Sequence, residues 1–179
     1  MPLEDLSIHG LKALSSDKSV NRGTGFDGLS TWFNDEIRKR PGLALDRATQ
    51  EKPGGGKRND CVVWRTRTAE TAFLELELKT PTTSITDPAF LNDAVAKAQR
   101  WSAPYVAIWN MQEAELYRTP SVGESISPAD VLQSWSTDKS IRTVEDWLDP
   151  DTHPGLRKRA IEILDAAFDF EHRPGGANR

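Results

Sequence analysis

The sequence predicts an α/β domain: a central mixed β-sheet flanked by helices, followed by a C-terminal helical extension. Two observations lead to this prediction. Segments with helical spacing alternate along the chain with strand-like segments, in the order helix, strand, strand, strand, helix, strand, with a second helical region behind. In the segment 73–79, leucines also alternate with charged residues, as expected of a strand whose two faces meet different surroundings.

The first half of the chain supplies two helices and three strands. A short helix is expected at 3–14, and a longer one at 26–40 that ends at Pro41-Gly42. The longer helix has apolar residues at helical spacing: Leu29, Trp32, Phe33 and Ile37. Alternation favours a strand at 43–49, and the runs 60–67 and 71–79 are close enough to form a hairpin.

The second half begins with a well-marked helix. Asp87 offers an N-cap and Pro88 suits the first helical position, so a helix is expected up to about Trp101. An apolar strand follows at 104–110, and the segment 115–118 is expected to pair with it across a turn.

A further N-cap signature at 127–130 predicts a short helix running toward Trp135. The last expected element is an amphipathic helix at 156–170, before a glycine-rich tail that resembles a linker. We therefore divide the chain into an α/β core with N-terminal helices at 1–125, and a helical extension with the tail at 126–179.

Composition narrows the class of protein. Of the 179 residues, 37% are hydrophobic and 28% charged, which is typical of a folded domain and not of a disordered chain. The sequence has no apolar run long enough for a membrane span and no apolar signal core at its start, and its single cysteine, Cys61, suits the cytoplasm. The net charge of −4 means that nucleic-acid binding must depend on a local basic patch, a metal ion or a partner.

The most informative residues lie on two neighbouring strands. Glu77 and Lys79 share one face of the strand at 71–79, with Glu75 and Phe73 expected beside them, while the alternate leucines face the other way. Asp60, which opens the preceding strand, is well placed to meet them. Two carboxylates suit Mg²⁺ or Mn²⁺, and a nearby ammonium suits charge building on a phosphate. The pattern therefore predicts a catalytic site of Asp60, Glu77 and Lys79.

The metal ligands expected from this reasoning are Asp60, Glu77 and the backbone carbonyl of Leu78. Lys79 is expected to position a water molecule or neutralise charge on the phosphorane. Glu75 is a candidate second ligand, with a solvated strand carboxylate as the alternative. An ordinary Glu–Lys contact on a surface strand is the alternative for Glu77 and Lys79.

Five basic residues are candidates for contacts with a DNA backbone. They flank Asp60 in the sequence, and the first three lie in a glycine-rich loop. They are Lys52, Lys57, Arg58, Arg65 and Arg67. A solvated loop explains the basic loop residues equally well.

Together these residues resemble the PD-(D/E)XK nuclease superfamily, and in particular the N-terminal nuclease domains of restriction and phage-defence enzymes. The resemblance covers about 26–118 and depends on Arg58-Asn59-Asp60, Glu77-Leu78-Lys79 and a following helix with Ala98-Gln99-Arg100-Trp101. Asn59 stands where the superfamily name has proline. The segment 103–110, with 115–117, is similar to the closing hairpin of these domains.

The resemblance implies a restriction-endonuclease-like core and a Mg²⁺-dependent deoxyribonuclease in which Mn²⁺ can substitute. It also implies supporting roles for Glu36 on the first long helix and for Gln99, although exposed polar helix faces explain both equally well. DNA is the expected partner, and a homodimer would supply two active sites for a double-strand cut. A larger defence complex, or a fused methyltransferase or translocase, would choose the target.

The sequence leaves two other functions open. One is a catalytically silent module that keeps the fold to bind DNA or a protein partner. The other is a nuclease for RNA or branched DNA, because the cutting chemistry is the same.

Overall fold

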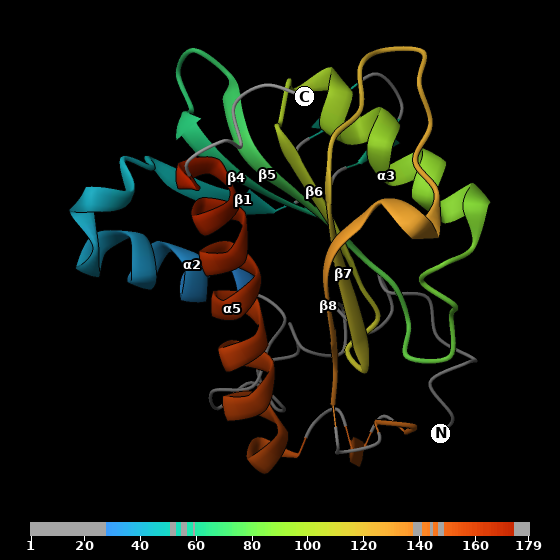
Figure 1. The fold of residues 1–179 in the computed structure, drawn as a ribbon. Coiled ribbons are helices and arrows are strands. Elements are labelled where there is room, and N and C mark those ends of the chain that lie inside the picture. The colour runs from blue at the N-terminus through green and yellow to red at the C-terminus, as the bar shows by residue number, and fades with distance from the viewer. Residues whose placement is uncertain are drawn as a thin grey trace.

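A six-stranded β-sheet forms the centre of the protein, in the order β1-β4-β5-β6-β7-β8 (Figure 1). The computed structural model describes residues 28–50, 53–54, 57–58, 60–137, 141–143, 145–146 and 149–173. Adjacent strands run antiparallel except β5 and β6, which are parallel. The predicted mixed sheet is therefore confirmed. The expected helix at 3–14 lies outside the described residues.

The elements have the following bounds. The α-helices are α2 (Gly28–Lys39), α3 (Pro88–Arg100) and α5 (His153–His172). The strands of the large sheet are β1 (Arg47–Gln50), β4 (Cys61–Thr66), β5 (Thr71–Leu78), β6 (Tyr105–Trp109), β7 (Glu113–Arg118) and β8 (Val131–Ser136). A separate small hairpin joins β2 (Pro53–Gly54) to β3 (Lys57–Arg58).

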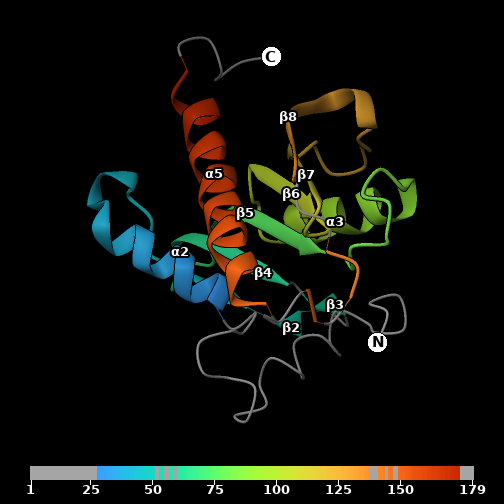
Figure 2. The ribbon, with the colours of Figure 1, turned by 90° about the horizontal axis from the view of Figure 1, so that it is seen from below.

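Helices cover both faces of the sheet and divide the core into two clusters. On one face α2 and α5 pack against the sheet, burying Leu29, Phe33 and Ile163 with Leu74 and Leu76. On the other face α3 supplies buried apolar residues that meet strands β4 and β6: Leu91, Ala94, Val95 and Ala98. Figure 2 shows α2 and α5 on one side of the strands and α3 on the other.

Strand β5 lies in the middle of this arrangement and is buried from Ala72 to Leu78. The expected alternation holds along most of it, because Leu74, Leu76 and Leu78 all belong to the cluster under α2 and α5. Glu75 lies opposite Val62 and Val106, which belong to the cluster under α3. The carboxylates of β5 thus face α3.

Phe73 does not share the face of the glutamates, contrary to the sequence prediction. The pairing of β4 with β5 shifts at this point: Val63 lies opposite Leu74, but Trp64 lies opposite Ala72. The extra residue turns Phe73 to the other side of the sheet, where its ring meets Tyr105 at 5.6 Å between centroids. A β-bulge therefore explains the difference.

The prediction of a helix from 127 toward Trp135 is also wrong. Ser127 does cap a 3-10 helix, Pro128–Asp130, with both hydrogen bonds of a capping box. The chain then continues as β8, which pairs antiparallel with β7 and completes the sheet. Residues after 125 therefore contribute a strand to the core as well as α5.

Other sequence predictions agree closely with the structure. Asp87 caps α3 by accepting a hydrogen bond from the Ala89 N–H at 2.8 Å, with Pro88 at the first helical position. The strand expected at 43–49 begins later, at Arg47, because 41–43 form a 3-10 helix that ends at Ala44 in a left-handed conformation. Among the described residues, the helices are too short or too polar to cross a membrane.

Candidate active site

Asp60 and Glu77 meet across the β4–β5 pair. Cys61 lies opposite Leu76, so the register continued by one residue places Asp60 opposite Glu77. Opposite residues of an antiparallel pair project to the same face, here the face covered by α3. Asp60 and Glu77 are both almost fully buried, with 4% and 2% exposure. The sequence prediction that these two acids converge agrees with this geometry.

A hydrogen bond fixes the orientation of Asp60. Its Oδ2 accepts from the backbone N–H of Leu78 at 2.9 Å, just beyond the end of the β4–β5 ladder. The bond ties the start of β4 to the end of β5. It also holds the Asp60 carboxylate beside Glu77.

Glu77 accepts hydrogen bonds from two lysines, one on each carboxylate oxygen. Lys79 Nζ lies 2.7 Å from Oε1, and Lys97 Nζ lies 2.5 Å from Oε2. A Glu77–Lys79 contact was also the alternative to a catalytic site, but these side chains are only 3% and 17% exposed and so do not lie on a surface strand. Lys79 also places its ammonium 4.5 Å from the centre of the Phe90 ring, a cation–π contact that restricts its position.

Sequence reasoning missed Lys97 as a member of this cluster. The side chain comes from α3 and is 7% exposed, which is rare for a lysine unless it is paired. Burial alone would lower the pKa of Lys97, but the nearby Glu77 carboxylate, with Asp60 and Asp93, raises it above the ordinary 10.5. Lys97 is therefore a charged group at neutral pH. Its signal in the sequence is a lysine within the apolar stripe of the helix, between Ala94 and Trp101.

Three supporting candidates have different positions. Glu75 is fully buried on the same face as Glu77, so it is not the solvated carboxylate offered as its alternative. Glu36 lies on α2, which covers the opposite face of the sheet, and pairs at 2.9 Å with Arg40, the residue after this helix. Gln99 donates to the backbone carbonyls of Pro120 and Ser121 and so anchors the loop after β7.

Asn110 is another residue that the predicted site did not include. It is buried and accepts from the N–H groups of Gln112 and Glu113, so it shapes the β6–β7 turn. Its amide also donates to the carbonyl of Thr83 at 2.8 Å. Asn110 thereby fixes the loop that follows Lys79.

Within the part of the chain that the structure describes, the basic residues proposed for DNA contact do not gather in one cluster. Arg65 pairs with Glu171 and stacks over Phe73, while Arg67 stacks over Trp64. Both lie near the start of β5, beside Thr71 and Ala72, roughly 17–20 Å along the strand from Glu77 at about 3.3 Å per residue. Lys57 and Arg58 belong to β3, where only the backbone is described, and Lys52 lies outside the described residues.

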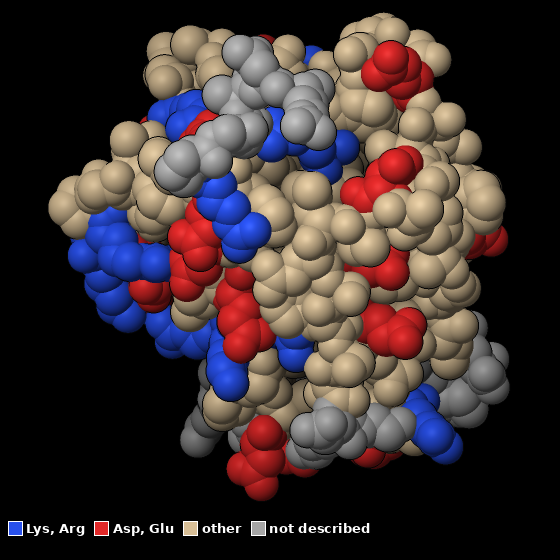
Figure 3. Space-filling model, in the orientation of Figure 1, with Lys and Arg blue, Asp and Glu red and all other residues tan. Residues whose placement is uncertain are grey.

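The charges over α2 and α5 are largely paired with one another. Figure 3 views this side, and lysine and arginine side chains gather at its left edge, with acidic side chains among them. Arg38 pairs with Asp35, and Arg40 with both Glu36 and Asp165. This face lies across the sheet from Glu77 and is not a continuation of the candidate active site.

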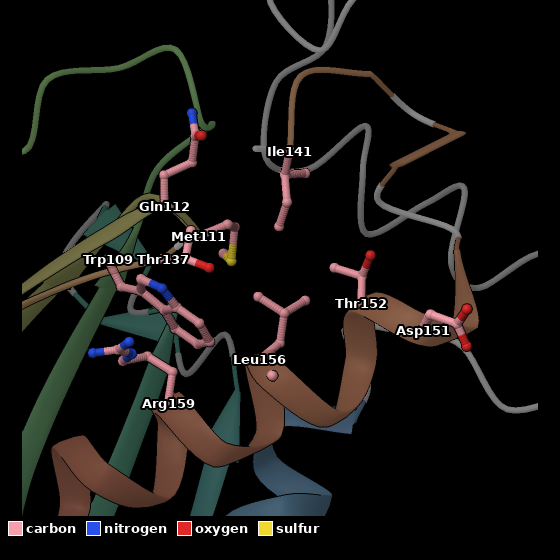
Figure 4. Close-up of a pocket in the computed structure, with 10 residues that line it drawn as sticks. Trp109, Met111, Gln112, Thr137, Ile141, Asp151, Thr152, Leu156 and Arg159 are labelled. Carbon is pink, nitrogen blue, oxygen red and sulfur yellow. The ribbon is translucent and has the colours of Figure 1, made fainter. Parts of the chain in front are cut away.

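A separate cavity of about 230 Å³ lies at the other face of the sheet, between the β6–β7 turn and the start of α5. Figure 4 shows Trp109, Met111 and Leu156 converging on it. Arg159, on its lining, already donates to the Ser136 carbonyl at 2.9 Å and pairs with Glu162. We interpret this cavity as a packing gap beneath α5.

The donor set at Asp60 and Glu77 fits a hard divalent cation. Mg²⁺ is commonly held by one or two carboxylates, with water and substrate oxygens as its remaining ligands. Asp60 and Glu77 would be the protein ligands, and the Leu78 carbonyl remains a predicted one. No cluster of three or more His, Cys, Asp or Glu residues suited to a metal occurs within the part of the chain that the structure describes.

Comparison with solved structures identifies a similar fold. The protein superposes on the crystal structure of the type IIG restriction endonuclease BpuSI with a TM-score of 0.57, over 79% of this chain and at 12% sequence identity. This chain has a restriction-endonuclease-like fold. At that identity the likeness concerns the fold alone, and this chain corresponds to only 16% of the BpuSI chain.

Comparison at the level of sequence adds no relative. No protein-family model matches the chain, and no curated protein matches it.

Proposed function

We propose that this chain is a metal-dependent DNA endonuclease domain of the PD-(D/E)XK type. The observation that carries the proposal is the meeting of Asp60, Glu77 and Lys79 at one end of β5. Asp60 is held beside Glu77 by its bond to Leu78, and Lys79 lies 2.7 Å from Glu77. The restriction-endonuclease-like fold supports the same conclusion.

Each residue has a distinct role in this proposal. Asp60 and Glu77 would hold Mg²⁺, or Mn²⁺ in its place. When bound, the ion would polarise the scissile phosphate and lower the pKa of a water molecule. Lys79, held by Glu77 and the Phe90 ring, would neutralise the negative charge that builds on the phosphate oxygens.

The biological setting proposed here is restriction or defence against phage DNA. BpuSI is a type IIG restriction endonuclease, and this chain matches a small part of it. A nuclease domain of this size, with a net charge of −4, would depend on further domains or subunits to recognise its target. A fused or associated methyltransferase or translocase, or a homodimer that makes paired cuts, belongs to this proposal.

The decisive experiment is digestion of supercoiled plasmid in the presence of Mg²⁺. We would compare the wild type with Asp60→Asn and Glu77→Gln, and use Asp151→Asn, an exposed residue on the other side of the sheet, as the matched control. Loss of at least about a hundredfold in rate in the first two variants, and no loss in the control, is expected. Equal rates in all four proteins would refute the proposal.

The same assay distinguishes the substrate class. Linear single-stranded DNA, RNA and a four-way DNA junction would be digested in parallel with the plasmid. Cleavage of RNA or of the junction alone would favour the alternative nuclease. Asp60, Glu77 and Lys79 would have the same roles in that enzyme.

One observation favours a second candidate function, a silent DNA- or partner-binding module. Both oxygens of Glu77 are already satisfied by Lys79 and Lys97, so the cluster needs no metal ion to remain buried. Calorimetric titration with Mn²⁺ tests this alternative. A protein that binds DNA but shows no Mn²⁺ binding dependent on Asp60 and Glu77 would be such a module.

A further inference from the structure

Lys97 occupies an unusual place for a lysine. It comes from the buried stripe of α3, between Ala94 and Ala98, and its ammonium reaches across to β5. There it lies 2.5 Å from Glu77 Oε2 and 3.3 Å from Asp93 Oδ2. One ammonium group is therefore shared between an acid of the candidate active site and an acid of its own helix.

Among Asp60, Glu77, Lys79 and Lys97 alone, the negative and positive charges are equal in number. Asp60 and Glu77 carry two negative charges, and the ammonium groups of Lys79 and Lys97 carry two positive charges, as a single divalent cation would. An ion bound between Asp60 and Glu77 would lie within a few ångströms of an ammonium on Glu77. At such distances like charges repel strongly in a buried site. One lysine must then move away from Glu77 when the ion binds.

Lys97 has a second carboxylate partner besides Glu77, whereas the second neighbour of Lys79 is an aromatic ring. Asp93 lies one turn before Lys97 on α3, and its side chain is 27% exposed. Because the Lys97 ammonium already contacts Asp93, a small rotation about its side-chain bonds would let it leave Glu77 and keep Asp93, with no change in the helix. The other contact of Lys79 is the Phe90 ring, which offers no full negative charge.

We propose that Lys97 is a positioning residue: it holds Glu77 in the metal-free protein and transfers to Asp93 when a divalent cation binds. The inference rests on the metal site of the proposed function. It assigns to Lys97 and Asp93 a role in setting the metal affinity. A purely structural lysine, by contrast, would support Glu77 in both states.

The test is calorimetric titration of Mn²⁺ into four proteins: the wild type, Lys97→Met, Asp93→Asn and the double variant. Methionine keeps the buried stem of the lysine and removes its charge. We expect Lys97→Met to bind Mn²⁺ at least about fivefold more tightly, because a competing positive charge is gone. We expect Asp93→Asn to bind several-fold more weakly, because Lys97 loses its second partner.

The double variant separates transfer from simple charge effects. If Asp93 acts through Lys97, Asp93→Asn should change the affinity little when Lys97 is already methionine. A simple loss of negative charge near the ion would weaken binding equally in both backgrounds, and that result would overturn the transfer. Circular dichroism melts would establish that all four proteins are folded.

The outcomes distinguish this inference from the proposed function. Binding by the wild type that Asp60→Asn abolishes, with equal or weaker binding by Lys97→Met, overturns the role of Lys97 and leaves the metal site intact. Binding that appears only in Lys97→Met supports the inference, since the lysine would then be the obstacle. Absence of binding in all the proteins, Lys97→Met included, overturns both.

Discussion

Asp60 and Leu78 are joined by a hydrogen bond, from the Leu78 N–H to Asp60 Oδ2 at 2.9 Å, although they belong to the start and the end of a hairpin. The bond satisfies a buried backbone donor at the point where the β4–β5 ladder has ended. It gives Asp60 a structural role in addition to the proposed metal-binding role. The two roles respond differently to mutation.

Asp60→Ala and Asp60→Asn should therefore differ in stability. Alanine leaves the buried Leu78 N–H without its acceptor, at an expected cost of about 1–3 kcal/mol in the free energy of unfolding. The amide oxygen of asparagine still accepts this hydrogen bond, so Asp60→Asn should lose less. Urea denaturation measures the difference, and both variants should lose cleavage. Equal stability of the two variants would contradict the role of the Leu78 bond.

Lys79→Met should lose cleavage and keep metal binding. Lys79 is expected to act on charge at the phosphate and not by coordination, so the rate should fall at least about a hundredfold while the Mn²⁺ affinity stays level or rises. Plasmid nicking and calorimetry measure the two effects. Lys158→Met, an exposed lysine on α5, is the matched control and should change neither. Loss of metal binding in Lys79→Met would show that its assigned role is wrong.

The two acids of the site were predictable because their positions depend on local pattern. Alternation along 71–79 put Glu77 and Lys79 on one face, and a short connection to the strand at 60–67 made a hairpin the simplest pairing. In such a hairpin the residue before the first strand lies near the end of the second, which is where Asp60 is found. Neither position depends on a contact between distant parts of the chain.

Other features depend on contacts that a single sequence does not reveal. Phe73 is displaced by a bulge, and a bulge exists only in relation to the partner strand. The residues after Asp130 form a strand because β7 offers an open edge beside them, although Ser127 gives a true capping signal. Lys97 is buried because it pairs with Glu77, and this partner lies on another element, so the sequence of the helix alone does not reveal it.

The chain's two tyrosines predict how its stability changes at high pH. Burial raises the pKa of both Tyr105 and Tyr117, and for Tyr117 the hydrogen bond that its hydroxyl donates to Glu115 raises the pKa further. A tyrosine in the unfolded chain has the ordinary pKa of about 10. The stability linked to these groups is therefore fully present below that pH and is lost as the pH rises toward the folded pKa values.

Tyr117→Phe should flatten this alkaline loss. The variant removes the group whose pKa is most raised, so its free energy of unfolding should fall less steeply above about pH 10 than that of the wild type. At pH 7 it should be less stable by about 1 kcal/mol, because the bond to Glu115 is gone. Urea denaturation over a pH series measures both, with tyrosinate absorbance as a second signal. Ionisation of the tyrosines well before unfolding would contradict the assigned cause.

Two glycines offer a matched pair for a test of backbone strain. Gly155 lies in the first turn of α5, and a Cβ added there would meet no atom within 4 Å. Gly123 has equally open surroundings but a φ of +92°, a conformation that residues with a Cβ rarely adopt. Gly155→Ala should therefore stabilise the protein by about 0.5–1 kcal/mol, through the lower helix propensity of glycine and the entropy of the unfolded chain. Gly123→Ala should destabilise it by about 1 kcal/mol or more, because only its backbone is strained. Thermal unfolding of the two variants beside the wild type measures the contrast, and shifts of the same sign in both would contradict it.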